Sequence, residues 1–317
     1  MVGVILAAAL AASWGILALR IGPRLGFVDH PDDPSLKAHE VPAVPLGGVG
    51  VFLAVHLGLA ASDRFDPWLA VGSAMLLVLG LVDDRFGLSP TVRLVVELGA
   101  GLFIGVGPAA VGGLGIGLAT AALTVLAVNA VNLFDGLDGL AAGVGLVAAL
   151  GMAGLAAVGG ESSEFGLLLA AALAGFLAWN LHPARMFLGD NGAYVLGGFL
   201  AYGIGSVGSN PGRFLVGSAL MGVYFLDLAF TILRRRLLGA ELFAGDRSHL
   251  YDRLRRQGLP VPAVAGLAMT VQAGWVLLVV GTTKILSPLV GALILAAVGA
   301  VSMAVLLGTK LVGGVER

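Results

Sequence analysis

The sequence contains no cysteine and few charged residues. The absence of cysteine excludes disulfides, thiolate metal sites and thiol catalysis. Charged residues make up 12% of the 317 positions, against roughly 25% in soluble domains. The 18 basic and 19 acidic residues leave a net charge of −1, so the chain has no overall attraction to a polyanion. Together these shortages exclude a soluble enzyme, a disordered chain and a nucleic-acid-binding protein.

Hydrophobic residues are abundant instead, at 58% of the chain, and the mean hydropathy is +0.99. The 50 glycines are scattered through apolar runs, as in helices that pack closely in lipid. A membrane-spanning helix needs about 20 mostly apolar residues. Eleven segments fit: 2–19, 46–61, 68–82, 94–111, 116–133, 140–158, 165–181, 193–207, 214–233, 261–281 and 286–312. The sequence therefore predicts an all-α, polytopic membrane helical bundle with about 11 transmembrane helices.

The polar connections between these segments are of two kinds. One set is long and basic: 20–45, 83–93, 182–191 and 234–260, and the stretch 129–139, which has no basic residue, belongs to the same side. The other set is short: 62–67, 159–164, 208–213 and 282–287. If the N-terminus is outside, 15 of the 18 Lys and Arg residues lie inside, which agrees with the positive-inside rule and predicts an N-out/C-in topology. No connection is long enough for a core of its own, so residues 1–317 are predicted to form one membrane domain.

Acidic residues gather at the inner ends of the predicted spans, where an acid is costly unless it has a function. The topology places all of them on one membrane face: Asp83, Asp84, Asp135, Asp138, Asp190, Asp246 and Asp252. A single aspartate of this kind can simply end a helix in the headgroup region. Asp83 and Asp84 are adjacent, however, and two neighbouring carboxylates repel each other unless a cation neutralises them. This pair therefore favours a metal site or a general base.

Asn132 precedes Asp135 and Asp138, and with Asp190 these side chains would form the oxygen-rich site that Mg²⁺ prefers. The segment Asp-Gly-Leu-Asp-Gly is equally compatible with an ordinary turn. A magnesium site near basic loops suits phosphoryl transfer, because the metal and the basic side chains stabilise the developing charge. The sequence has no Walker A motif, so a nucleotide would have to be bound in another way.

Five motifs in this order resemble those of the polyprenyl-phosphate N-acetylhexosamine-1-phosphate transferases, glycosyltransferase family 4. They are KAHEVPAVPLGG, LVDDRFGLSPTVRL, NAVNLFDGLDGLAAG, FLGDNGAYVLGG and DRSHLYDRL. The resemblance implies a multi-pass enzyme of the cell membrane with its active site on the cytoplasmic face. Such an enzyme transfers a HexNAc-1-phosphate, here GlcNAc-1-phosphate, from a UDP-sugar to undecaprenyl or another polyprenyl phosphate. It releases UMP and starts a cell-surface glycan. The resemblance also implies Mg²⁺ as the cofactor, with Mn²⁺ as an alternative, and allows a homodimer.

The resemblance assigns a role to each matching residue. The catalytic candidates are Asp83 and Asp84, the acidic pair that would deprotonate or position the lipid phosphate, together with Asp135 and His249. The metal candidates are Asn132 and Asp190. The substrate-binding candidates are Lys37 near the lipid phosphate, His39 in the same loop, Arg93 at the pyrophosphate, Gly136, Asp138 and Phe187 around the uracil ring, and Arg247 and Arg253 in the loop that recognises sugar and pyrophosphate.

The last loop departs from the family pattern. The family often has His-x-His-His there, whereas this chain has His249, Leu250, Tyr251 and Asp252. We therefore expect Tyr251 and Asp252 to matter less than His249. The missing histidines favour UDP-GlcNAc or a related HexNAc donor over UDP-MurNAc-pentapeptide, although a sister enzyme with that donor stays the main alternative. The alternative is that this loop is only a solvated segment that does not contact the substrate.

Two further alternatives concern the kind of activity. A cation-coupled transporter would carry acids along a path through the membrane, but only two acids, Glu97 and Asp227, lie within predicted spans. For the enzyme, we expect direct attack of a lipid-phosphate oxygen on the β-phosphorus of the donor. A two-step route through an aspartyl-phosphate is the alternative mechanism.

Overall fold

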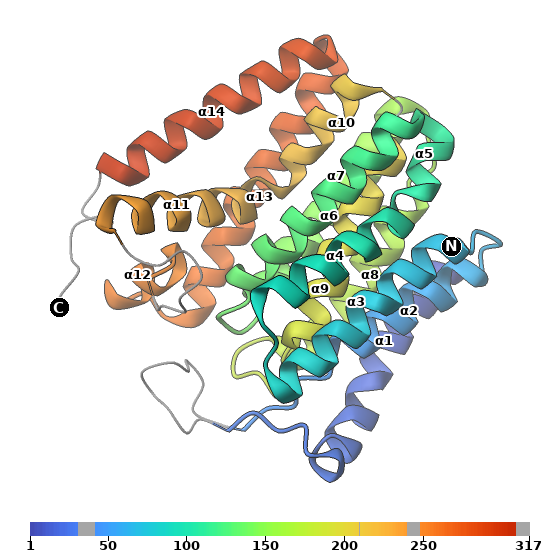
Figure 1. Ribbon diagram of the computed structural model, residues 1–317, viewed down its shortest axis with the longest axis vertical. Helices are drawn as coiled ribbons and strands as arrows, with labels where there is room; N and C mark the ends of the chain where they lie inside the picture. The colour runs from blue at the N-terminus through green and yellow to red at the C-terminus, as the bar shows by residue number, and fades with distance from the viewer. Residues whose placement is uncertain (31–41, 209, 240–247, 309–317) are drawn as a thin grey trace.

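The computed structural model describes residues 1–30, 42–208, 210–239 and 248–308, and the regular elements in these ranges are helices (Figure 1). In chain order they are α1 (Val2–Ile21), the 3₁₀ helix η1 (Pro23–Leu25), α2 (Gly47–Ala60), α3 (Pro67–Phe86), α4 (Pro90–Ile104), α5 (Val106–Gly112), α6 (Leu114–Phe134), α7 (Leu140–Gly159), α8 (Glu164–Asn180), α9 (Gly189–Val207), α10 (Pro211–Ser218), η2 (Ala219–Met221), α11 (Gly222–Leu238), α12 (Leu250–Arg256), α13 (Val261–Ile285) and α14 (Pro288–Gly308). The prediction of an all-α bundle is confirmed for the described residues.

Each of the eleven predicted apolar segments corresponds to a helix or to an interrupted helix. The segment 94–111 is divided between α4 and α5, which meet at a bend of 44°. The segment 214–233 runs through α10, η2 and α11. Within the described residues, five helices are long and apolar enough to cross a membrane, or six if the bent pair counts as one span. These helices identify a multi-pass membrane protein, while the number eleven and the orientation stay predictions.

Several helices begin at a capping residue followed by proline, a pairing that suits the first turn of a helix. The Asp66 side chain accepts hydrogen bonds from the backbone N–H groups of Trp68 and Leu69 at the start of α3, at 2.8 and 3.1 Å. Ser89 precedes Pro90 at the start of α4 in the same way. These local signals explain why α3 and α4 start where they do and leave a short turn between them.

Helix α9 lies at the centre of the bundle, where it packs against α6, α3 and α2 (Figure 1). Most of its residues are buried. Two glycines permit the closest crossings, because a Cβ on Gly80 of α3 would overlap the backbone of Asn191, and a Cβ on Gly48 of α2 would overlap the backbone of Gly192. The end of α3 and the start of α2 are thereby brought to the N-terminus of α9.

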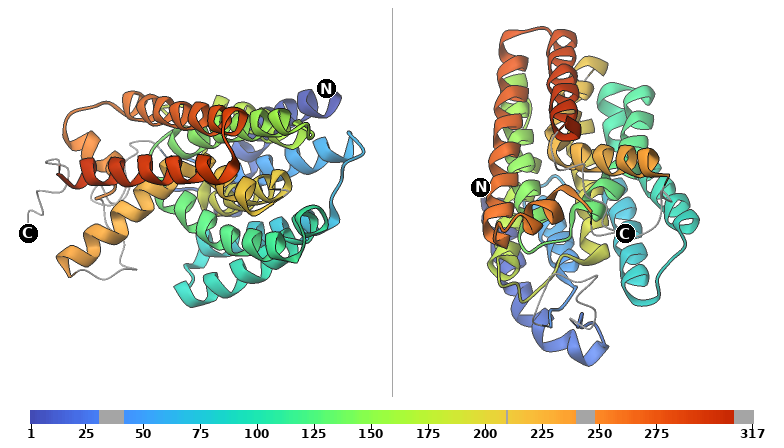
Figure 2. Two further views of the ribbon diagram at one scale, coloured as in Figure 1. Left: turned by 90° about the horizontal axis from the view of Figure 1, so that it is seen from above. Right: turned by 90° about the vertical axis from the view of Figure 1, so that its left-hand side faces the viewer.

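The C-terminal helices form the other side of the molecule. Helix α13 packs along α7, and α14 packs against α10 and α13. Helix α11 runs at a steep angle to α13 and α14 (Figures 1 and 2). An apolar groove of about 450 Å³ lies between these three helices, with α12 and the turn from α6 to α7 at its end.

Candidate active site

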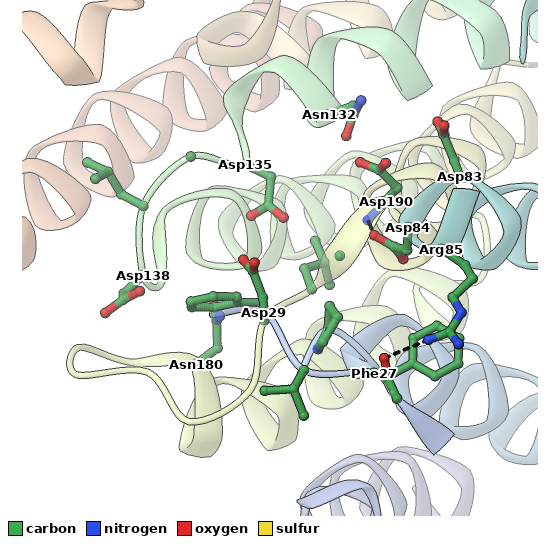
Figure 3. A pocket seen from close by; sticks show the side chains of 18 residues that line it. Phe27, Asp29, Asp83, Asp84, Arg85, Asn132, Asp135, Asp138, Asn180 and Asp190 are labelled. Atoms are coloured by element: carbon green, nitrogen blue, oxygen red, sulfur yellow. Dashed lines mark hydrogen bonds between the residues drawn. The ribbon is translucent and has the colours of Figure 1, made fainter. Parts of the chain in front are cut away.

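A polar cavity of about 570 Å³ lies where the end of α3, the turn after α6 and the start of α9 meet (Figure 3). Eight of the fourteen site residues predicted from the sequence line it: Asp83, Asp84, Asn132, Asp135, Gly136, Asp138, Phe187 and Asp190. Among the described residues of its wall, six are aspartates and one, Arg85, is a cation. Five of the seven acids that the sequence placed on one membrane face therefore line one cavity, whereas Asp252 does not line it and Asp246 lies outside the described residues.

Asp84 is held by the first turn of α9. Its Oδ1 accepts a hydrogen bond from the Asp190 N–H at 2.9 Å, and its Oδ2 accepts from the Asn191 N–H at 3.2 Å. The Asn191 side-chain amide donates both to Asp84 Oδ2 and to the Pro45 carbonyl, each at 2.7 Å. The free N–H groups at a helix N-terminus favour a negative charge. Asp84 therefore acts as a cap supplied by another helix, and it fixes Asp190 at the cavity wall.

Asp83 directly precedes Asp84 near the end of α3 and is buried. Its Oδ1 accepts from the Leu88 N–H at 2.6 Å, which fixes the turn between α3 and α4. Its Oδ2 accepts from the Tyr194 hydroxyl and from the Arg93 guanidinium, the latter at 3.2 Å. Arg93 does not line the cavity itself, but it contacts Asp83, which does. The two members of the acidic pair thus have separate sets of donors.

The turn between α6 and α7 carries Asp135, Gly136 and Asp138. The Asn180 side chain accepts from the Gly139 N–H at 3.1 Å and donates to the Met186 carbonyl at 2.9 Å, so it links this turn to the segment before α9. The Asp138 carboxylate pairs with His182 Nδ1 at 2.8 Å and accepts from the Ala184 N–H at 3.0 Å. The same segment pairs with the chain before α2, because the Phe187 N–H donates to the Val44 carbonyl at 3.0 Å.

Burial and mutual repulsion raise the pKa of three carboxylates in this cavity, those of Asp84, Asp135 and Asp190. Burial, and then repulsion from Asp190, Asp84 and Asp138, raises the pKa of Asp135 to about 8. Burial, and then repulsion from Asp84 and Asp83, raises the pKa of Asp190 to about 7. Burial also raises the pKa of Asp84, although its hydrogen bonds from Asn191 and Asp190 oppose the shift. A divalent cation between these groups would relieve the repulsion.

The donor set fits Mg²⁺ that is bound together with a phosphate. Within the described ranges, no three His, Asp or Glu side chains are close enough to hold a metal ion by themselves. Mg²⁺ commonly takes one or two carboxylates and completes its shell with water and substrate phosphates. Asp190 and Asn132 could supply the protein ligands, because both side chains point into the cavity (Figure 3).

The remaining candidates lie elsewhere. His249 is buried outside the cavity wall, and its Nδ1 lies 2.8 Å from Asp227 Oδ2. Arg253 is also buried, with its guanidinium 5.5 Å from the centre of the Phe230 ring. Lys37, His39 and Arg247 lie outside the described residues.

The sequence interpretation did not single out several residues of the cavity wall. They include Phe27, Asp29, Arg85 and Asn180. The Arg85 guanidinium donates to the Gly26 carbonyl at 2.8 Å and so joins α3 to the loop after η1. Arg85 directly follows the acidic pair and Asp29 lies in the first inner loop, so both positions could have been found in the sequence. Asn180 had no such signal, because its two hydrogen bonds depend on how α8 packs.

Comparison with known proteins identifies the family. The model of glycosyl transferase family 4 matches residues 67–208, which include the end of α3, the α6–α7 turn and α9. A probable undecaprenyl-phosphate N-acetylglucosaminyl 1-phosphate transferase of Bacillus subtilis is 33% identical over 76% of this chain and 73% of its own length. A decaprenyl-phosphate N-acetylglucosaminephosphotransferase of Mycobacterium tuberculosis is 32% identical, over 75% and 71%. A phospho-N-acetylmuramoyl-pentapeptide-transferase of Moorella thermoacetica is 42% identical over 43% of each chain.

The matched residues contain most of the polar cavity, and the alignments with the first two relatives extend over about three quarters of the chain. The resemblance seen in the motifs is therefore confirmed over about three quarters of the chain. The chain belongs to glycosyl transferase family 4.

Proposed function

We propose that this chain transfers N-acetylglucosamine 1-phosphate from UDP-N-acetylglucosamine to a polyprenyl phosphate, releases UMP and starts a cell-surface glycan. The names of the Bacillus and Mycobacterium relatives, which align over three quarters of the chain, support this transferred group and this acceptor, and the family implies the UDP donor. The relative named for phospho-N-acetylmuramoyl-pentapeptide transfer aligns over less than half. A sister enzyme with that donor is the second candidate.

The observation that carries the proposal is the position of the polar cavity next to the apolar groove. The segment 132–140 forms part of both walls: Asn132 and Asp135 face the cavity, while Phe134 and Leu140 face the groove. An acceptor with a charged phosphate and a long hydrocarbon chain needs both environments side by side. We place its phosphate in the cavity and its chain along α11, α13 and α14.

The chemistry follows from the charges of the cavity. An oxygen of the lipid phosphate attacks the β-phosphorus of the donor, the bond from this phosphorus to the bridging oxygen breaks, and UMP leaves with that oxygen. Mg²⁺, when bound, neutralises the pyrophosphate. Asp190 and Asn132 would hold it, Asp84 keeps Asp190 in place through the start of α9, and Asp83 holds Arg93 near the wall. A two-step route through a covalent aspartyl-phosphate is the alternative.

We further propose eleven spans in the plasma membrane, with the cavity on the cytoplasmic side. The support is the asymmetry of charge, because 15 of the 18 Lys and Arg residues fall on one side when the spans alternate from an outside N-terminus.

The test is an assay of the purified chain in detergent with undecaprenyl phosphate and a panel of UDP-sugars. Mass spectrometry should detect a lipid diphosphate that carries HexNAc, formed with UDP-N-acetylglucosamine in preference to UDP-MurNAc-pentapeptide. Product with UDP-MurNAc-pentapeptide alone would favour the sister enzyme. Labelled phosphate trapped covalently on enzyme incubated with donor but without lipid would overturn direct attack.

A further inference from the structure

His249 takes part in a buried contact outside the wall of the polar cavity. Its Nδ1 lies 2.8 Å from Asp227 Oδ2 in α11, and the two side chains are 4% and 1% exposed. Thr231, one turn later in α11, lies 3.2 Å from the same nitrogen. The other Asp227 oxygen accepts from the Leu250 N–H at 2.9 Å and so fixes the first residue of α12. Asp227 thereby sets the ring orientation of His249 and the start of α12 together.

Tyr251 continues this contact toward the cavity. Its ring stacks on the His249 ring with centroids 5.3 Å apart and an interplanar angle of 4°. Its hydroxyl donates to the Leu133 carbonyl at 3.2 Å, and its ring meets the Phe134 ring edge to face at 5.9 Å. Leu133 lies in the last turn of α6, whose carbonyl groups have no partner within the helix. Tyr251 thus caps the helix end that carries Asn132 and Asp135.

Tyr251 also lies directly behind Gly136. A Cβ on Gly136 would overlap the Tyr251 hydroxyl. Gly136 lines the polar cavity, whereas Tyr251 lines the apolar groove. Tyr251 therefore supports the wall between the cavity and the groove from the groove side. His249 is not among the residues that line the polar cavity.

We propose that Asp227, His249 and Tyr251 form a supporting column that holds the 132–136 segment in position, and that His249 is a positioning residue that acts through Tyr251. Asp227 orients His249, the imidazole ring supports the Tyr251 ring, and the Tyr251 hydroxyl fixes the end of α6. The inference rests on the proposed function for its kinetic consequences. It also gives Tyr251, which the sequence interpretation expected to matter less than His249, a direct part in the geometry of the site.

Two amide substitutions separate this role from direct contact with substrate. His249→Asn places an amide near Nδ1 and keeps the bond to Asp227, while His249→Gln places its amide near Nε2. The column predicts that His249→Asn keeps activity within about tenfold of the wild type, since a hydrogen bond to Asp227 is retained. His249→Gln and His249→Ala should both lose about 100-fold in kcat, in the range of coupling between residues in contact. If the imidazole instead contacts the substrate through Nε2, His249→Gln should be more active than His249→Asn.

Tyr251→Phe keeps the stacked ring and removes only the hydroxyl. We expect kcat to fall about three- to tenfold, the effect of one lost hydrogen bond, with an unchanged KM for polyprenyl phosphate. The matched control is Tyr202→Phe, because the Tyr202 hydroxyl donates to Asp66 at the opposite end of the 20-residue α3. That variant should keep wild-type kcat and both KM values.

Hydrogen–deuterium exchange of the peptide that contains residues 132–139 gives a readout without turnover. Exchange should be faster in Tyr251→Phe and His249→Gln than in the wild type, and unchanged in Tyr202→Phe. Wild-type exchange and kcat in Tyr251→Phe, or higher activity in His249→Gln than in His249→Asn, would overturn the column. The transfer activity of the wild-type enzyme tests the proposed function separately. If the wild type transfers no sugar phosphate, the exchange measurement still tests the column.

Discussion

The aspartates of the polar cavity differ in what already binds them. Asp83 and Asp84 accept hydrogen bonds from backbone and side-chain donors on three helices or turns. Within the described part of the chain, no hydrogen bond reaches the carboxylates of Asp135 and Asp190. A carboxylate whose lone pairs are occupied binds a cation less readily than one that faces open space. At the scale of single residues, Asp190 therefore has lone pairs available for the metal ion that it would hold with Asn132, and Asp135 is the second carboxylate available nearby.

Asp190→Asn keeps the volume of the side chain and removes its charge. We expect turnover to fall about 100-fold or more, because a metal ion stabilises transition-state charge by several kcal/mol and about 1.4 kcal/mol corresponds to tenfold in rate. The Mg²⁺ concentration for half-maximal activity should rise. Asp63→Asn is the control, since Asp63 is exposed and has a positive φ of 55° that asparagine also adopts. Unchanged turnover and Mg²⁺ dependence in Asp190→Asn would show that the metal assignment is wrong.

The raised pKa values of Asp135, about 8, and Asp190, about 7, make the stability of the protein depend on pH and metal together. Without metal, these two carboxylates bind more protons in the folded protein than in the unfolded chain from about pH 4 to about pH 8, so the stability that they contribute falls as the pH rises through this window. Mg²⁺ binds the ionised carboxylates. The rise in melting temperature that Mg²⁺ produces should therefore be larger at about pH 8 than at about pH 6.

Thermal unfolding in detergent, with and without Mg²⁺, checks this expectation. The double variant Asp135→Asn/Asp190→Asn should show a small Mg²⁺ effect at both pH values. An equal effect of Mg²⁺ on the wild type at the two pH values would contradict the link between metal binding and these carboxylates.

At the scale of helices, the site depends on the crossing of α3 and α9. Gly80 lies one turn before Asp84, and its missing side chain lets α3 approach the first turn of α9. Gly80→Ala should push the helices apart, destabilise the protein by about 1–3 kcal/mol and lower turnover, because the Asp84 cap would lose its geometry. Melting temperature and kcat measure the two effects.

Gly99→Ala in α4 is the matched control for this substitution. The nearest atom to a Cβ on Gly99 is Met75 Cε at 3.5 Å, an ordinary contact. Alanine is favoured over glycine inside a helix by about 0.5–1 kcal/mol, so this variant should be as stable as the wild type or more so. Equal melting temperatures for the Gly80 and Gly99 variants would refute the role of the crossing.

The sequence predicted the helices well where apolar residues ran on without a break. It did not predict the bend between α4 and α5 or the interruption between α10 and α11, because apolar composition is the same on both sides of each break. The convergence of Asp84, Asp135 and Asp190 could be predicted, since the alternation of spans fixes which ends share a face. The contacts of Asp227 with His249 could not, because they depend on how α11 and α12 meet in space.

For the molecule as a whole, the eleven-span topology predicts that two positions lie on opposite sides of the membrane. A reporter fused after Arg317 should be cytoplasmic, and a reporter inserted in residues 159–164 should be external, because the chain crosses the membrane an odd number of times between them. Fluorescent and phosphatase reporters, which are active on opposite sides, measure this directly. A cytoplasmic signal at residues 159–164 would place the basic connections on both sides of the membrane. The acidic residues would then no longer share one membrane face.

The central claim is that the bond from the donor's β-phosphorus to its bridging oxygen breaks and that this phosphorus moves with the sugar to the lipid. UDP-N-acetylglucosamine labelled at the β-phosphorus tests it with the purified chain and undecaprenyl phosphate. The account predicts that the label enters the lipid product and that the released nucleotide is unlabelled UMP. Label that stays in the nucleotide as UDP, with sugar alone on the lipid, would contradict it.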